Sequence, residues 1–395
     1  MDDTRPGGYG DASDAAEGDG EPRLDSGGFS LDLDQEQPDD RIEEPFDPNE
    51  IDVRTRTMTV DLLLARLRRG ILDLAPDFQR NSGIWREKHK SRLIESLLLR
   101  IPLPSFYAAE NEDEEWAVVD GVQRLTTIAR FVNPESIGAN PLILRDLEYL
   151  DYNGYSYSDL PGRLQTRLDE TEVLIHLIGK ATPEEVKFNI FGRINTGGLP
   201  LSRQELRHAL IPGPARGLLA ELAASSDFQR ATHGSVRDAR MSDREMVLRF
   251  LAFRLFEPAD YKSQDLDDFL RQAMKQINQL PEDRIAELKA DFRWAMGAAT
   301  EVFGEHAFRK RTREQTTRNP INKALFEAVA VNLAKRSDAE LAVLTTNRED
   351  VRGRLADLLA ESEFNDAISV ATGDRGKVRR RFTALDELFT EVTDA

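Results

Sequence analysis

An apolar run near the middle of the N-terminal half leads into four residues that could form a site for a phosphate group and its metal ion: Asp120, Gly121, Gln123 and Arg124. Residues 116–119 (WAVV) are apolar and partly β-branched, which predicts a buried strand. From Val122 onward the apolar residues recur at helical spacing, so the strand is expected to pass into a helix within about two residues. The first turn of a helix has unpaired N–H groups and a positive dipole end, and glycine lets a phosphate approach them closely.

Each polar side chain of this junction has a possible chemical role. Asp120 would stand at the end of the strand, where a carboxylate could hold Mg²⁺ or orient a water molecule. Arg124 could donate two hydrogen bonds to phosphate oxygens, and Gln123 adds a side-chain amide. A structural explanation also exists, because Asp-Gly after a strand is often only a turn and an arginine in a first helical turn is usually solvated.

Four ordered motifs resemble the N-terminal domain of GmrSD-type modification-dependent restriction enzymes, whose fold is distantly related to ParB and sulfiredoxin. They are DGxQR at 120–124, DFQRNSGIW at 77–85, LIESLLLRIPLPSFY at 93–107 and FGRINTGGLPLSRQEL at 191–206. The similarity continues through 246–253 to ATGDRGKVRRRF at 371–382, and thus covers roughly residues 50–390. The middle position of DGxQR is often Gln in the family and is Val122 here.

The resemblance implies an α+β protein in which a small ParB/sulfiredoxin-like mixed sheet with packing helices precedes an all-α helical region. We expect an acidic tail at 1–50, the DGxQR domain at 51–200 and the helical domain at 201–395. The implied cofactors are Mg²⁺, held by Asp120, and a nucleoside triphosphate. The implied catalytic residues are Asp120, Gln123 and Arg124, and the implied nucleotide-binding residues are Gly121, Arg193, Asn195, Gln79 and Arg80.

The two glycines after Asn195 have two interpretations. Gly197 and Gly198 allow left-handed backbone conformations, and successive N–H groups in such a bend can form an anion-binding nest. The same glycines are also typical of a helix end with no ligand. Glu205 resembles a ParB nucleotide contact, but Ser202 and Glu205 also form a capping box for the next helix.

Composition limits the class of protein. Residues 1–50 hold 17 Asp plus Glu and three Arg, a net charge of −14 out of the −18 of the whole chain, which is typical of a disordered segment. The chain has no cysteine, which excludes disulfides and thiolate metal sites. With no membrane-spanning run and no signal-peptide pattern, we expect a cytoplasmic protein.

Periodicity predicts the elements that position these residues. Before the junction we expect a helix capped by Thr59, a strand at 71–74, a helix at 86–100 and a strand at 105–109. After it we expect strands at 142–144 and 173–178 and helices at 159–168 and 183–194. Beyond residue 200 we expect helices, some with cap signals at Ser242 and Ser337: 214–224, 242–256, 265–278, 281–303, 321–335 and 348–362.

Two basic clusters in the helical region could contact a DNA backbone. The candidate DNA-binding residues are Arg309, Lys310, Arg311, Lys377, Arg379, Arg380 and Arg381; Arg313, Arg318 and Arg375 extend the clusters. Charge runs on helices are also commonly solvated faces, and the two clusters need not share one face.

The sequence shows no nuclease centre of the histidine-metal type. Its five histidines are scattered singly, so we expect any module that cuts DNA to lie elsewhere, for example on a nuclease partner chain. The leading hypothesis is a bacterial defence component that binds and hydrolyses a nucleoside triphosphate while its helical region senses DNA or a partner. The alternatives are a non-catalytic DNA-binding or adaptor protein switched by a nucleotide, and a DNA-nicking activity of the sheet domain itself.

Overall fold

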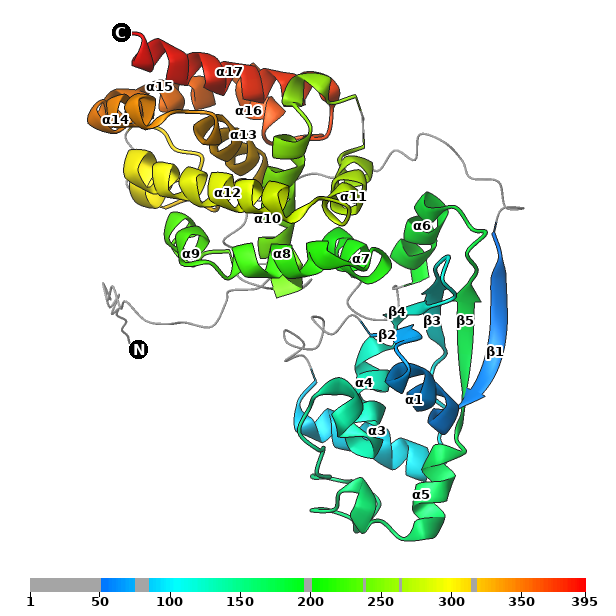
Figure 1. The fold of residues 1–395 in the computed structure, drawn as a ribbon. Helices are drawn as coiled ribbons and strands as arrows, with labels where there is room; N and C mark the ends of the chain where they lie inside the picture. Colours follow the sequence, from blue (N-terminus) through cyan, green and yellow to red (C-terminus); the bar gives the residue numbers. More distant parts are fainter. Residues whose placement is uncertain (1–50, 75–84, 195–200, 237–238, 263–264, 314–317) are drawn as a thin grey trace, which may run out of the picture.

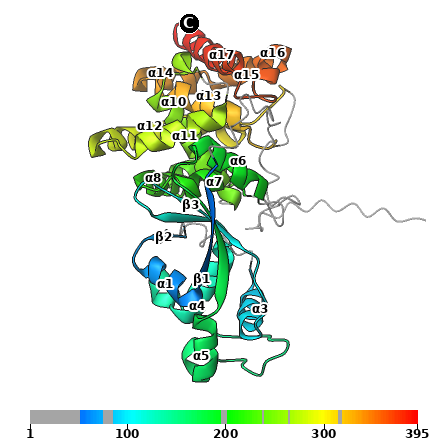
Figure 2. The same cartoon turned by 90° about the vertical axis from the view of Figure 1, so that its right-hand side faces the viewer.

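A computed structural model describes residues 51–74, 85–194, 201–236, 239–262, 265–313 and 318–395. The chain forms a five-stranded mixed sheet with its helices, followed by a region built almost wholly of helices, so the α+β prediction is confirmed. Figures 1 and 2 show the sheet unit and the helical unit stacked end to end, with α6 and α7 between them.

The sheet has the strand order β1-β5-β3-β4-β2. β1 pairs antiparallel with β5, β3 antiparallel with β4, and the pairs β3–β5 and β2–β4 are parallel. The bounds are β1 Val53–Thr59, β2 Leu72–Asp73, β3 Phe106–Glu110, β4 Trp116–Asp120 and β5 Glu172–Ile178. β1 is the outer edge strand on the right of Figure 1, and it was not predicted.

Helices cover one face of the sheet and bury a first apolar core. They are α1 Val60–Arg68, α3 Glu87–Leu98, α4 Val122–Val132 and α5 Gly162–Asp169. Thr59 caps α1 by accepting a hydrogen bond from the Leu62 N–H, as expected. Trp116, Phe106 and Ile128 are almost fully buried in this core. Burial of these large side chains stabilises the packing of the helices on the sheet.

Residues 142–144 do not form the strand that was predicted there. Leu142 and Leu144 are fully buried, but they lie in an irregular segment. The N–H of Leu142 bonds to the Arg130 carbonyl, and the N–H of Leu144 bonds to the Tyr155 carbonyl. The alternating apolar residues therefore reflect a loop packed against the helices, because periodicity alone cannot separate this case from a strand.

A second core occupies the helical unit and extends onto the sheet. It includes Phe188 and Phe191 of α6 and the sheet residues Ala109, Val119 and Ile178. The helices of this part are α6 Glu184–Ile194, α7 Arg203–Leu210, α8 Pro214–Ala223, α9 Ser226–Thr232, α10 Ser242–Leu255, α11 Leu266–Ile277, α12 Glu282–Phe303, α13 Lys323–Ala334, α14 Asp338–Thr346, α15 Arg348–Ala360, α16 Ser362–Ala367 and α17 Arg375–Thr393.

Two of the three expected capping boxes form. Ser202 with Glu205 opens α7, and Ser337 with Glu340 opens α14. The third prediction is wrong: Met241, in a left-handed conformation, precedes α10, and Ser242 does not cap it. Glu245 instead makes ion pairs with Arg249 and Lys323, which uses the carboxylate that a capping box would need.

Candidate functional site

The junction of β4 and α4 has the geometry expected of an anion site. Asp120 is the last residue of β4, and Gly121 precedes α4 with φ 91°, a left-handed conformation that favours glycine. Gly121 offers no side chain to cap the helix, so the first-turn N–H groups have no intrahelical or side-chain partner. These donors and the helix dipole together favour a negatively charged group at this point.

Gly121 is also required by its neighbours. A Cβ at this position would lie 2.9 Å from Cε1 of Phe106 and 3.1 Å from Nη2 of Arg124. Both the backbone angle and the crowding therefore exclude a side chain. The sequence anticipated the glycine's permissive backbone but not the close contact with Phe106.

Arg124 is held by the fold around it. Its Nη2 donates to Asp120 Oδ2 at 2.9 Å and to the Ser105 carbonyl at 3.2 Å, and its Nη1 donates to the Pro104 carbonyl. The guanidinium lies over the Phe106 ring, 4.7 Å from its centroid, and its side chain is only 13 % exposed. Burial lowers the pKa of Arg124 from its ordinary value, with Asp120 opposing that shift. Arg124 therefore ties the segment before β3 to α4, whatever ligand it also binds.

Asp120 and Gln123 are better placed to meet a ligand. The Asp120 side chain is 35 % exposed, and its ion pair with Arg124 uses one carboxylate oxygen, Oδ2. Gln123 is half-buried in the first turn of α4, one turn before Thr127, whose hydroxyl donates to the Gln123 carbonyl. The structure thus brings together four of the predicted residues: Asp120, Gly121, Gln123 and Arg124.

The remaining predicted nucleotide-binding residues are not joined to this cluster by the described contacts. Arg193 is exposed near the C-terminal end of α6. Gln79, Arg80 and Asn195 lie outside the described residues. Their roles stay predictions.

A magnesium ion fits Asp120 only in the manner of a substrate-bridged ion. Among the described residues, no group of three Asp, Glu or His side chains could hold a metal. Mg²⁺ commonly binds through one or two carboxylates together with substrate phosphates and water. Asp120, with part of its carboxylate exposed beside the α4 N-terminus, meets that requirement.

Two residues assigned to a DNA-binding surface are inside the protein, and the assignment is corrected for them. Arg309 is 3 % exposed and donates to the Thr232 and Asn319 carbonyls and to Ser235. Arg381 is fully buried. A guanidinium enclosed in this way cannot reach a phosphate backbone.

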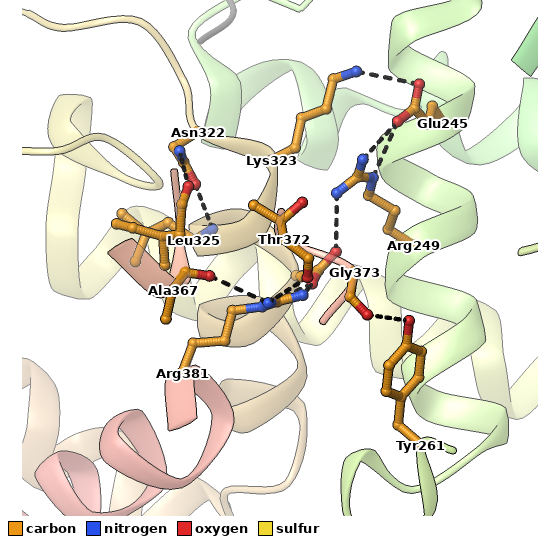
Figure 3. A network of polar contacts seen from close by, with 12 residues as sticks. Glu245, Arg249, Tyr261, Asn322, Lys323, Leu325, Ala367, Thr372, Gly373 and Arg381 are labelled. Atoms are coloured by element: carbon orange, nitrogen blue, oxygen red, sulfur yellow. Dashed lines mark hydrogen bonds and ion pairs between the residues drawn. The ribbon is translucent and has the colours of Figure 1, made fainter. Parts of the chain in front are cut away.

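Arg381 instead belongs to a buried polar network (Figure 3). It forms an ion pair with Glu327, whose other carboxylate oxygen accepts from Arg249, and it donates to the Thr372 carbonyl at 2.7 Å. Arg249 continues to Glu245 at 2.9 Å. Burial alone would raise the pKa of Glu245, but nearby Lys323 and Arg249 hold it well below its usual range. The network therefore joins α10, α13 and α17.

The outer basic residues border one short segment, α16 and the turn after it. Lys310 donates to Ser369, Lys377 to the Val370 carbonyl and to Asp366, and Arg380 pairs with Glu361. The two basic clusters thus lie side by side, which the sequence left open. Acidic partners neutralise several of these cations, while Arg379 is exposed and Arg311 is half-buried. Their contact with DNA stays a prediction.

Ionic and aromatic contacts connect β2 to α8, and α6 to α11. Asp73, at the end of β2, accepts from Arg216 of α8 at 2.7 Å. Glu184 of α6 pairs with Lys275 of α11, and Arg271 lies over the Phe188 ring at 4.9 Å. β2 pairs with β4, so the helical unit touches a strand adjacent to the candidate site. The next motif of the chain, DFQRNSGIW, follows β2 closely but lies mostly outside the described residues.

A family model described as the GmrSD restriction endonuclease N-terminal domain matches residues 61–212. This part of the chain belongs to that family. The GmrSD N-terminal domain contains the whole β4–α4 junction and extends through α7, and it indicates a GmrSD-like restriction or defence component. No curated protein matches the chain. In the described part of the chain, no helix is long and apolar enough to cross a bilayer.

Proposed function

We propose that this chain binds a nucleoside triphosphate with Mg²⁺ at the β4–α4 junction, hydrolyses it, and acts in a GmrSD-like restriction system. The observation that carries the proposal is the crowded Gly121 at the start of α4, which leaves the first-turn N–H groups of a GmrSD N-terminal domain uncapped beside Asp120. A phosphate would accept from these N–H groups, and the helix dipole would stabilise its charge.

Hydrolysis at this site requires the protein to position the reactants and neutralise charge, and it requires no covalent bond between protein and phosphate. A water molecule attacks the terminal phosphorus and forms a new P–O bond as the bond to the bridging oxygen breaks. The proton of the water passes to the released inorganic phosphate, and the nucleoside diphosphate leaves with its charge stabilised. Asp120 would hold Mg²⁺, which would supply positive charge to neutralise the phosphate. Asp120 orients the water or the ion, Gln123 contacts the water or the ribose, and Arg124 contributes its positive charge from a fixed position.

Sensing by the helical unit is part of the same proposal. The Asp73–Arg216 and Glu184–Lys275 ion pairs provide a physical link between the nucleotide domain and the helices. DNA contact would use the exposed cations near α16, and cutting of DNA would fall to a nuclease partner chain.

The second candidate function is a non-hydrolysing nucleotide switch. The engagement of Arg124 by two backbone carbonyls favours it, because such an arginine is less free to follow a transition state.

The test is phosphate release from ATP, GTP, CTP and UTP with Mg²⁺, with and without DNA. Wild type is compared with Asp120→Ala, Gln123→Ala and Arg124→Lys, each checked for folding by circular dichroism. Turnover in the wild type that falls at least tenfold in folded Asp120→Ala supports hydrolysis at this junction. Tight binding without turnover selects the switch, and the absence of both rejects the nucleotide site.

A further inference from the structure

Four residues are paired in register across four adjacent strands next to the candidate site. Thr55 of β1 is in register with His176 of β5, and His176 is in register with Tyr107 of β3. A register shift after Tyr107 then pairs it with Asp120 of β4. Because neighbouring strands are about 4.8 Å apart, Asp120 and His176 stand about 10 Å apart along this row.

The two aromatic members of the row contact each other. The rings of Tyr107 and His176 are 4.8 Å apart between centroids with an interplanar angle of 30°. His176 Nδ1 lies 3.1 Å from the Thr55 hydroxyl, which fixes the orientation of the imidazole and leaves Nε2 for a further partner. The pair is therefore a preorganised aromatic surface.

This surface is on the sheet face opposite the first apolar core. Side chains alternate along a strand, so Val173, Ile175 and Leu177 of β5 face that core while Leu174 and His176 face the other way. Leu174 is 41 % exposed, and both rings are only half-buried. On this face Tyr107 packs against the second core with part of its ring, and the two rings and Leu174 together remain partly accessible to solvent.

We propose that Tyr107 and His176 form the stacking platform for the base of the nucleotide whose phosphates bind at Gly121. This inference rests on the proposed function and identifies how its ligand is recognised. The row leads from the helix N-terminus to the rings over a span that suits an extended nucleoside triphosphate. Stacking on an aromatic side chain is tolerant of base identity, and Thr55 and His176 Nε2 supply polar groups for the base edge.

Inorganic tripolyphosphate separates base recognition from phosphate recognition. Binding of tripolyphosphate and of ATP, GTP, CTP and UTP, each with Mg²⁺, is measured by calorimetry for wild type, Tyr107→Leu, Tyr107→Phe and His176→Leu. Tyr149→Leu, at a tyrosine that is 74 % exposed, serves as the matched control. Nucleotide affinity is expected to fall about 5- to 100-fold in the Leu variants at 107 and 176, since base stacking has that magnitude. Tripolyphosphate affinity, the Tyr107→Phe variant and the control are expected to match wild type.

Three results would overturn the platform. They are unchanged nucleotide affinity in the folded Leu variants, equal losses for nucleotide and tripolyphosphate, and a wild type that binds tripolyphosphate as tightly as every nucleotide. In the last case the phosphate site of the proposed function survives. A wild type that binds none of the five ligands removes both proposals. Quenching of 2-aminopurine riboside triphosphate by the wild type is a second readout that needs no variant, and its absence on binding also counts against stacking.

Discussion

Replacing Arg124 tests whether the arginine of the DGxQR motif is a structural residue as well as a ligand contact. Arg124→Met keeps most of the aliphatic stem but removes three charge-assisted hydrogen bonds, to Asp120 and to the carbonyls of Pro104 and Ser105. It also removes the contact of the guanidinium with the Phe106 ring.

The expected loss in the free energy of unfolding follows from these contacts and from the burial of Arg124. Hydrogen bonds to charged groups contribute about 1.5–3 kcal/mol each, but they are not additive within one network. The desolvation that lowers the pKa of Arg124 is relieved by the substitution, which offsets part of the loss. We expect the free energy of unfolding of the sheet unit to fall by about 2–4 kcal/mol. Arg124→Lys keeps a charge near Asp120 but lacks the planar fork for two carbonyls, so we expect about half that loss.

Urea unfolding followed by tryptophan fluorescence measures the change. A Trp294→Phe background leaves Trp85 and Trp116, so the signal reports on the sheet unit. Arg68→Met is the matched control, because Arg68 is half exposed and only 4.0 Å from Asp61, and such pairs contribute about 0–1 kcal/mol. An Arg124→Met protein within about 0.5 kcal/mol of its background would refute the structural assignment. Arg124 would then be free to serve the ligand alone.

Three further substitutions test other features. Glu327→Gln leaves Arg381 buried without its ion pair, and thermal unfolding should show a loss of about 3–5 kcal/mol; a loss below about 1 kcal/mol would contradict a buried charge pair. Burial, together with the positive charges of Arg216 and Arg244, lowers the pKa of His208 from 6.5 to about 3. The stability that neutral His208 contributes is therefore complete above pH 6.5 and is lost as pH falls from there. The free energy of unfolding of wild type, measured with urea, should fall by about 1.4 kcal/mol per pH unit more steeply than that of His208→Asn between pH 6 and 5, and equal slopes would exclude His208 as the source. Gly121→Ala strains a left-handed backbone against Phe106, so we expect lower stability and loss of tripolyphosphate binding, whereas Gly138→Ala, which has open space around it, should keep binding.

Local patterns determined the parts of the site that depend on neighbours in sequence. The strand at Trp116, the break at Gly121 and the helix from Val122 were predicted and confirmed, because a change of period and a glycine act over a few residues. The caps at Thr59 and Ser202 were predictable for the same reason.

Pairing between strands far apart in the sequence decided which other residues lie near the site. β1 is rich in Arg and Thr and shows no apolar alternation, since an edge strand exposed on most positions needs little burial of its own. Its pairing with β5 is what places Thr55 against His176. No spacing along the chain could show that Tyr107, His176 and Asp120 form one row, because register is set by contacts between distant strands.

The arginines of the two basic clusters show the same limit of prediction from sequence. Arg309 and Arg381 are members of basic runs that look alike in sequence to the exposed Arg379. Packing of α10, α13 and α17 around Glu327 buries Arg381. Contacts with residues far away in the sequence, among them Thr232 and Ser235, bury Arg309. The sequence alone thus determined the local fold of the β4–α4 junction, while tertiary structure decided what surrounds it, because burial and strand register depend on residues far apart in the chain.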